Sequence, residues 1–168
     1  MKHFFKQMSL ICLCLFALIG HAIADTLLDA KHAFDAGDYA KATKLFKPLA
    51  KKGNAIAQVS LGEMYINGQG VPQDDQEAEK WYRLAAAQGN SVAQSYLGWM
   101  YINGQGVPQN LVLAYMWLNI ASATEKDSNR KQQAAENRDK TARLMNEQQI
   151  AEAQELTKKC TTNKFKGC

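Results

Sequence analysis

The residue types that most often carry catalysis are few in this chain and form no recognisable set. Of three histidines in 168 residues, only His32 lies beyond an apolar N-terminal segment. No cluster of cysteine, histidine and carboxylate residues at metal-ligand spacing surrounds His32. The serines lack the histidine and acid partners that would activate one of them as a nucleophile. We therefore predict no catalytic residue, no metal site, no cofactor and no enzymatic activity.

Two further patterns could suggest chemistry, and both have simpler explanations. The Gly-x-Gly pairs at 68–70 and 104–106 could cradle a phosphate, but a lone Gly-x-Gly is a weak signal and no strand precedes either copy. The acidic residues between 74 and 79 fit a capped, solvated helix start. A glycosidase would need two carboxylates that face each other across a cleft.

The glycine pairs belong to a repeat. The segment from Tyr65 to Gln73 returns unchanged from Tyr101 to Gln109, an offset of 36 residues. A period of this length with one glycine-rich turn per unit indicates a stacked array. Helix N-caps are predicted at Asp38, Asp74 and Asn110, which share the same offset. The predicted fold is all-α: an α-solenoid of stacked antiparallel helix pairs with a C-terminal capping helix pair.

The packing positions of the two copies resemble the Sel-like repeat (SLR) family, a relative of the tetratricopeptide repeat (TPR). The residues that carry this resemblance in the first copy are Ala57, Leu61, Gly62, Tyr65, Gly68, Gly70, Val71, Ala78, Trp81, Ala85, Ala86 and Gly89. The second copy matches through Ala93, Leu97, Gly98, Tyr101, Gly104, Gly106, Val107, Ala114 and Trp117. The resemblance implies a stacked superhelix that serves adaptor, regulatory or host-interaction roles.

The chain then divides into five predicted parts. These are a signal peptide at 1–24, a partial TPR-like helix pair at 25–53, SLR repeats at 54–89 and 90–125, and capping helices with a tail at 126–168. The last part has lost the glycine-rich turn and is more polar, as the end of a stacked array must be. Asn146 and Gln149 there have the spacing of a capping box.

The N-terminus has the features of a secretory signal. Lys2 and Lys6 precede an apolar run over 8–19, and Ala22-Ile23-Ala24 supplies the small residues of a cleavage site. We predict cleavage after Ala24 and a periplasmic or secreted bacterial protein, the alternative being an uncleaved anchor. The remaining chain has 18 basic and 16 acidic residues, a net charge of +2, and no basic cluster. This charge excludes a nucleic-acid footprint, and we expect no membrane span after signal removal.

Two cysteines remain after that cleavage, Cys160 and Cys168. An even pair in an exported protein suggests a disulfide. The short loop that it closes would give a stabilisation of roughly 2 kcal/mol. The alternative is two free thiols at a frayed end.

Differences between the two copies are the best guide to a binding surface, because packing does not fix them. Ser60 and Glu63 in the first copy correspond to Tyr96 and Trp99 in the second. Residues three apart share a helix face, and large aromatics that depart from the repeat pattern are typical of interface anchors. The predicted partner-binding residues are Glu63, Gln94, Tyr96 and Trp99. The alternative is that both aromatics pack on the long helix that begins near Ser128.

The predicted function is that of an exported helical-repeat protein that binds another protein or a peptide and performs no catalysis. An alternative is binding of cell-wall peptidoglycan, or modulation of a cell-wall enzyme, with Tyr96 and Trp99 stacked on sugar rings. Arg83 and Asn119, a second pair of equivalent positions that differ, are predicted to lie at the surface.

Overall fold

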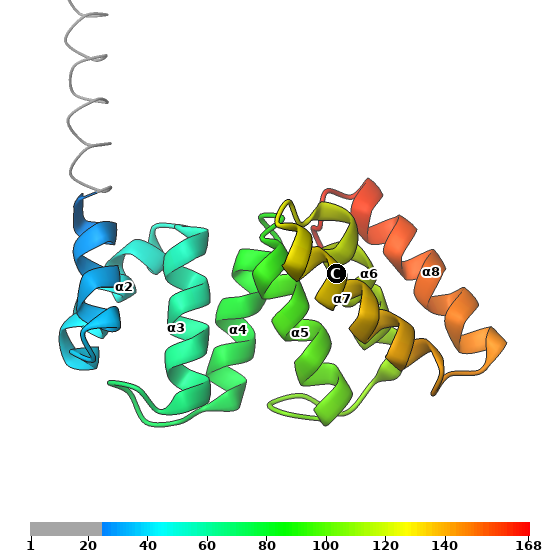
Figure 1. The fold of residues 1–168 in the computed structure, drawn as a ribbon, viewed down its shortest axis with the longest axis horizontal. Coiled ribbons are helices and arrows are strands. Elements are labelled where there is room, and N and C mark those ends of the chain that lie inside the picture. Colours follow the sequence, from blue (N-terminus) through cyan, green and yellow to red (C-terminus); the bar gives the residue numbers. More distant parts are fainter. Residues whose placement is uncertain (1–24) are drawn as a thin grey trace, which may run out of the picture.

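Helices follow one another in a row along the described chain (Figure 1). The structure, a computed structural model, describes residues 25–168, so the predicted signal peptide at 1–24 lies outside the described residues. A helical segment over 25–35 is followed by α2 (Tyr39–Lys51), α3 (Ala55–Asn67), α4 (Asp75–Ala86), α5 (Ser91–Asn103), α6 (Leu111–Thr124), α7 (Ser128–Ala142) and α8 (Glu147–Thr162). None of the helices within 25–168 is both long and apolar enough to cross a membrane.

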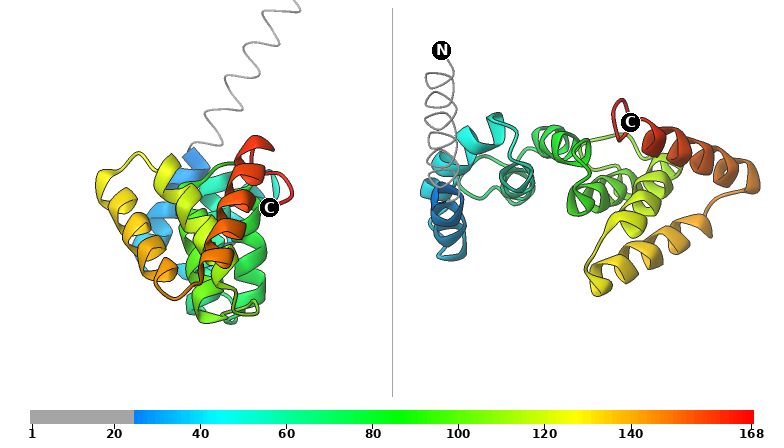
Figure 2. Two further views of the ribbon diagram at one scale, coloured as in Figure 1. Left: turned by 90° about the vertical axis from the view of Figure 1, so that its right-hand side faces the viewer. Right: turned by 90° about the horizontal axis from the view of Figure 1, so that it is seen from above.

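Consecutive helices pack against each other as far as α6, and α6 then contacts both α7 and α8. Viewed from above, α7 and α8 form a V whose tip points away from the row, and together they close that end (Figure 2). Every regular element of residues 25–168 is a helix. The predicted all-α solenoid with a C-terminal capping helix pair is therefore confirmed.

The helix caps keep the period of the sequence. The side chains of Asp38, Asp74 and Asn110 each accept a hydrogen bond from the backbone N–H three residues later, at 3.1, 2.9 and 3.0 Å. The predicted capping box at Asn146 and Gln149 is complete. Asp74 and Glu77 form only half a box: the Asp74 N–H donates to the Tyr65 carbonyl, and the Glu77 carboxylate pairs with Lys80 at 2.9 Å.

Each of the two SLR repeats has one buried side chain that fills the space beside a helical glycine. Phe46, Tyr82 and Leu118 occupy equivalent positions, 36 residues apart, and are almost fully buried. A Cβ built on Gly62 would lie 2.6 Å from Cε1 of Tyr82, and one on Gly98 would lie 2.6 Å from Cγ of Leu118. A neighbouring helix therefore approaches closely at these glycines, and each glycine is the only residue that leaves enough room.

The glycine-rich turns join one unit to the unit before it. Gly70 has φ +69° and lies against the backbone of Tyr39 at the start of α2. Gly106, with φ +70°, lies in the same way against Asp75 at the start of α4. Both the left-handed conformation and the missing side chain are needed there. The turns are thus packing elements between units.

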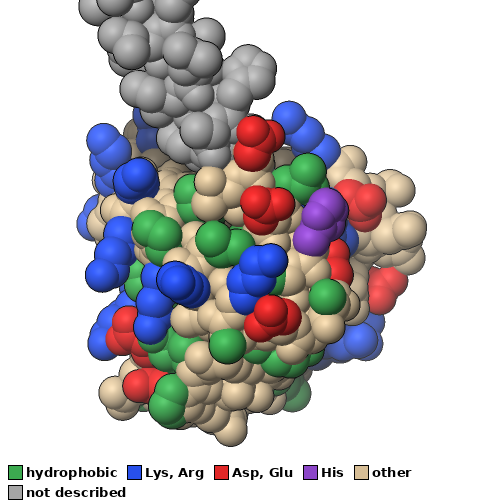
Figure 3. All heavy atoms as spheres, turned by 90° about the vertical axis from the view of Figure 1, so that its left-hand side faces the viewer, with side chains coloured by type: hydrophobic (Ala, Val, Ile, Leu, Met, Phe, Trp, Pro, Cys, Tyr) green, Lys and Arg blue, Asp and Glu red, His purple; other side chains and the backbone are tan. Residues whose placement is uncertain are grey.

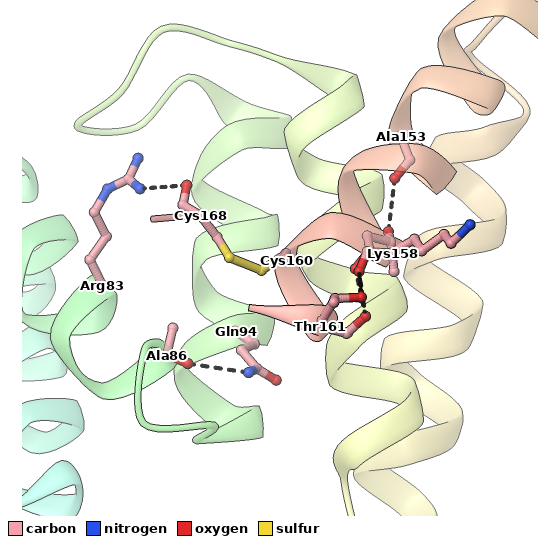
Figure 4. The surroundings of a disulfide bond; sticks show 10 residues. Arg83, Ala86, Gln94, Ala153, Lys158, Cys160, Thr161 and Cys168 are labelled. Atoms are coloured by element: carbon pink, nitrogen blue, oxygen red, sulfur yellow. Dashed lines mark hydrogen bonds between the residues drawn. A yellow bond between two sulfur atoms is a disulfide. The ribbon is translucent and has the colours of Figure 1, made fainter. Parts of the chain in front are cut away.

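The tail after α8 folds back to α4 and the turn that follows it, and Cys168 lies beside Arg83 (Figure 4). Cys160 and Cys168 are joined by a disulfide, with Cα atoms 5.5 Å apart. Nη1 of Arg83 donates to the carbonyl of Cys168 at 3.3 Å, and the ring of Phe165 covers Gly89. The C-terminal cap is therefore fastened to the first SLR repeat as well as to α6.

The opposite end of the array is closed by the helical segment 25–35. On this end face hydrophobic side chains are scattered among lysine, arginine and acidic groups (Figure 3). A mixed polar face suits the solvent-exposed end of a solenoid.

Candidate partner-binding groove

A groove with a volume of about 420 Å³ runs between α7 and the first helices of the two SLR repeats. It exists because α7 packs on α6 and leaves the outer face of α5 uncovered. We call it the α5–α7 groove and define it by the six lining residues used below: Glu63, Tyr82, Tyr96, Trp99, Glu125 and Arg130.

Three of the four predicted partner-binding residues line the groove. Glu63 comes from α3, and Tyr96 and Trp99 come from α5. Trp99 is 42% exposed, which is unusual for a side chain of this size. Tyr96 is half-buried, and its ring lies on that of Tyr82 with centroids 4.7 Å apart. The two aromatics therefore form one wall of the groove, and residues of α7, the helix that begins at Ser128, line it as well.

Gln94, the fourth predicted residue, is not part of the groove. Its side chain is fully buried. Its Nε2 donates to the carbonyl of Ala86 at 3.3 Å (Figure 4), and its Oε1 accepts from Thr124 at 3.0 Å. Gln58, 36 residues earlier, likewise donates to the carbonyl of Ala50. The glutamine thus forms the same hydrogen bond to the preceding helix in both repeats. Its presence in both copies already indicated a structural role.

Tyr82 is a groove residue that the sequence reasoning missed. Its hydroxyl is buried and has no hydrogen-bond partner among residues 25–168. Burial raises the pKa of Tyr82 far above its ordinary value, and Tyr96 and the charge of Glu63 raise it further. The signal was available: the equivalent residues, Phe46 and Leu118, carry no polar group.

The carboxylate of Glu63 is half-buried and, within the described chain, has no hydrogen-bond donor or cationic partner. Asn67 donates only to the backbone carbonyl of Glu63, at 3.0 Å. Burial raises the pKa of this carboxyl group. The same charge raises the pKa values of Tyr82 and Tyr96, after the larger effect of their burial. Glu63 on α3 therefore lies near Tyr82 on α4 of its own repeat and near Tyr96 on α5 of the next repeat.

Glu125, on the other wall, is fully satisfied. Its carboxylate, with a side chain only 7% exposed, accepts bonds from Ser91 at 2.9 Å and from Arg130 Nε at 3.1 Å. It also accepts from the backbone N–H groups of Lys126 and Asp127. Desolvation acts to raise the pKa of Glu125, but these hydrogen bonds outweigh it and lower the pKa to about 2. The pair with Arg130 leaves Glu63 as the uncompensated charge of the groove.

The groove is equipped for non-covalent binding. Among the described residues no group of three or more histidine, cysteine or acidic side chains could hold a metal ion. The groove offers two aromatic faces, a free carboxylate and a free hydroxyl. Such a combination of apolar surface with a few polar groups is typical of recognition sites.

A second hollow, of about 460 Å³, lies beneath the tail. Leu84 on α4, Trp117 on α6 and Phe165 in the tail line it, and its surface is almost wholly apolar. Trp117 belongs to the core, and the tail forms one wall. The hollow is therefore part of the contact between the cap and the repeats.

Comparison with known proteins gives a family match. The Sel1 repeat family matches residues 35–54, 55–90 and 91–123, which together make more than half of the 168 residues. The comparison with curated proteins finds no match.

Two solved structures are similar. One is a protective antigen present in uropathogenic Escherichia coli strains that displays an SLR fold, with 31% sequence identity and a TM-score of 0.75 over 82% of this chain. The other is a Sel1 repeat protein from Oxalobacter formigenes, with 26% identity and a TM-score of 0.57 over 70% of this chain. The chain spans only 29% of the first protein and 54% of the second.

Sel1 repeats generally form scaffolds for protein–protein interaction and are typically not catalytic. The period of 36 residues, the helical glycines with their facing side chains and the glycine-rich turns are what such a scaffold requires. The chain belongs to the Sel1 repeat family.

Proposed function

We propose that this chain is an exported adaptor or regulatory scaffold that binds a segment of another protein in the α5–α7 groove, without catalysis. The observation that carries the proposal is the position of Tyr96 and Trp99. These aromatics replace Ser60 and Glu63 of the preceding repeat, so the repeat packing does not require them. Both line a groove large enough for several side chains of a peptide.

The exposure of Trp99 supports a binding role for the groove. A tryptophan that is 42% exposed leaves a large apolar area in water, and covering it would contribute to binding by about 25 cal/mol per Å². Tryptophan and tyrosine are also enriched among the residues that dominate interface energies. The half-buried Tyr96 is held in place by the ring of Tyr82, so little side-chain entropy would be lost on binding.

Export is proposed from the N-terminal segment, with cleavage after Ala24 and a periplasmic or secreted location. The pair Cys160–Cys168 is compatible with an oxidising compartment. The division of the chain into parts at 25–53, 54–89, 90–125 and 126–168 belongs to the same proposal.

The alternative function is binding of peptidoglycan or modulation of a cell-wall enzyme. The exposed indole of Trp99 favours it, because a flat aromatic face can stack on a sugar ring. In this alternative the groove would bind the glycan directly, and the ligand would not be a peptide.

A peptide display library of defined composition tests the proposal. The protein is first exported into a bacterial periplasm and purified, and the library is then screened against it. The comparison is with Tyr96→Ser/Trp99→Glu, which gives the second repeat the residues of the first. Glu155→Gln, at an exposed position of α8, is the control. We expect peptides that are enriched on the wild type and the control and lost on the double variant.

Two results would contradict the peptide proposal. Enrichment of the same peptides on the double variant would remove the groove as the site. The cell-wall alternative would be favoured by two results together. No peptide would be enriched, and the wild type, but not the double variant, would co-sediment with purified peptidoglycan.

A further inference from the structure

We infer that the α5–α7 groove selects partners by a basic side chain, whose ammonium or guanidinium group is held by the Glu63 carboxylate, the Tyr82 hydroxyl and the indole face of Trp99. The inference rests on the proposed binding function and adds the chemistry of the bound group.

The first support is the unpaired charge of Glu63. A carboxylate that is half-buried without a donor is unfavourable, as the raised pKa of Glu63 indicates. The array contains a ready comparison in Glu125, whose equally negative group is bonded by Ser91, Arg130 and two backbone N–H groups. A cationic group from outside the chain would supply to Glu63 what Arg130 supplies to Glu125.

The second support is the hydroxyl of Tyr82, which is independent of the acid. It is buried, it belongs to a side chain that lines the groove, and it has no partner in residues 25–168. An unsatisfied buried hydroxyl costs roughly 1–3 kcal/mol. Packing does not explain it, because Phe46 fills the equivalent position without the oxygen. A hydroxyl oxygen can accept a hydrogen bond from an ammonium or guanidinium group.

The third support is the balance of charge and the aromatic wall. The groove contains two carboxylates, Glu63 and Glu125, and one guanidinium, Arg130, a net charge of −1. Trp99 offers an exposed ring, and tryptophan has the most favourable face for a cation. An anionic group, such as a peptide carboxylate, would be repelled by the unpaired negative charge of Glu63. Charge complementarity therefore favours a basic occupant.

The test uses three defined probes: the N-acetyl N-methylamides of lysine, arginine and norleucine. Each is titrated into the isotopically labelled, exported protein, and binding is followed by NMR at the indole N–H of Trp99. We expect saturable shifts with lysine or arginine, or with both, and none with the uncharged norleucine. The two basic probes distinguish an ammonium from a guanidinium partner.

Three variants assign the contacts. Glu63→Gln should weaken binding of the basic probe about tenfold, as expected for a lost charge-assisted hydrogen bond. Tyr82→Phe, which copies Phe46, should weaken it about threefold while the fold is retained. Glu155→Gln removes a distant acid and should change nothing. Equal binding of norleucine, or unchanged affinity in both Glu63→Gln and Tyr82→Phe, would overturn the inference.

The result is separable from that of the peptide screen. Groove-dependent peptides that lack lysine and arginine would leave the binding function standing and reject the basic occupant. A screen without any groove-dependent peptide would reject the binding function itself. Groove-dependent peptides that share one basic residue would support both.

Discussion

The rings of Tyr82 and Tyr96 stack with centroids 4.7 Å apart and planes 9° from parallel. Tyr82 lies in the second helix of one repeat and Tyr96 in the first helix of the next. One residue of the pair occupies a position that every unit fills with a large side chain, whereas the other is peculiar to the second copy. The stack therefore connects the constant packing of the array to the variable surface of the α5–α7 groove.

Tyr82→Phe should raise the free energy of unfolding by about 1 kcal/mol, or leave it unchanged, because the buried hydroxyl has no partner. Urea unfolding followed by circular dichroism measures this difference. Tyr82→Leu, which copies Leu118, is the contrasting variant and should destabilise by about 1–3 kcal/mol through the lost ring stack and volume. A loss above about 1 kcal/mol in Tyr82→Phe would mean that the hydroxyl has a partner in the free protein.

Gly62→Val should lower the free energy of unfolding by about 2–4 kcal/mol or more. The new side chain would begin 2.6 Å from the ring of Tyr82, and overpacking in a core is costly. Ala57→Leu, also at a fully buried position, should act in the same direction. Ala151→Val at an exposed site on α8 controls for the β-branched side chain and should cost roughly 0.5 kcal/mol. Equal melting temperatures for Gly62→Val and this control would contradict the packing of α3 on α4.

Glu125 should make the protein sensitive to acid. Its pKa falls from 4.5 to about 2 on folding, so its stabilising effect is complete above pH 4.5 and is lost as the pH drops toward 2. Glu125→Gln should therefore destabilise by roughly 2 kcal/mol at neutral pH, and the difference from wild type should shrink at low pH. Parallel denaturation series at several pH values measure it, with Glu155→Gln as the exposed control. A difference that is independent of pH would exclude ionisation of Glu125 as its cause.

Binding of a basic ligand in the groove should weaken as the pH falls through the raised pKa of Glu63. Protonation removes the charge that holds the ligand. Tyr82 and Tyr96 stay neutral, because burial raises their pKa values, and Glu125 stays ionised with its pKa of about 2. The Arg130 guanidinium keeps its charge throughout. Titration of the lysine probe at a series of pH values should show this loss of affinity in the wild type and a constant affinity in Glu63→Gln. The same pH dependence in both proteins would mean that a group other than Glu63 causes it.

Reduction of the bond between Cys160 and Cys168 should lower the melting temperature. Closing so short a loop contributes about 2 kcal/mol, and the bond also holds Phe165 over Gly89. Cys160→Ser/Cys168→Ser should reproduce the effect of reductant and be insensitive to further reductant. An unchanged melting temperature would show that the tail contributes no stability. Phe165→Ala separates the contact of the ring from the effect of the covalent bond.

The fold was predictable because its signals are local and repeated. A turn copied without change, and caps such as Asp38 and Asp74 at one offset, indicate both the helices and their stacking. The packing of α7 was less predictable. Its sequence has few apolar residues, and the structure buries only Ala134 and Thr141 among its side chains. The groove depends on where such a helix rests, so a repeat pattern alone does not reveal it.

The site was predictable in part, and the residues that were predicted wrongly serve packing between units or attachment of the cap. Gln94 is close in sequence to the variable aromatics, but it recurs as Gln58 and serves packing. Arg83 and Asn119 differ between the copies, yet neither is a simple surface residue. Arg83 binds the hydroxyl of Tyr101 and the tail, and Asn119 accepts from Arg138 on α7. Some differences between the repeats therefore serve attachment of the cap, so a difference between the copies does not by itself indicate a binding residue.

The series Phe46, Tyr82 and Leu118 has a consequence for how such arrays diversify. Phenylalanine and tyrosine differ by one oxygen atom, and a single-base change in the gene converts one into the other. A unit of the array can thus gain or lose a polar group beside the groove while its core keeps the same shape. New specificity can then arise in one unit at a time, at little risk to the folding of its neighbours.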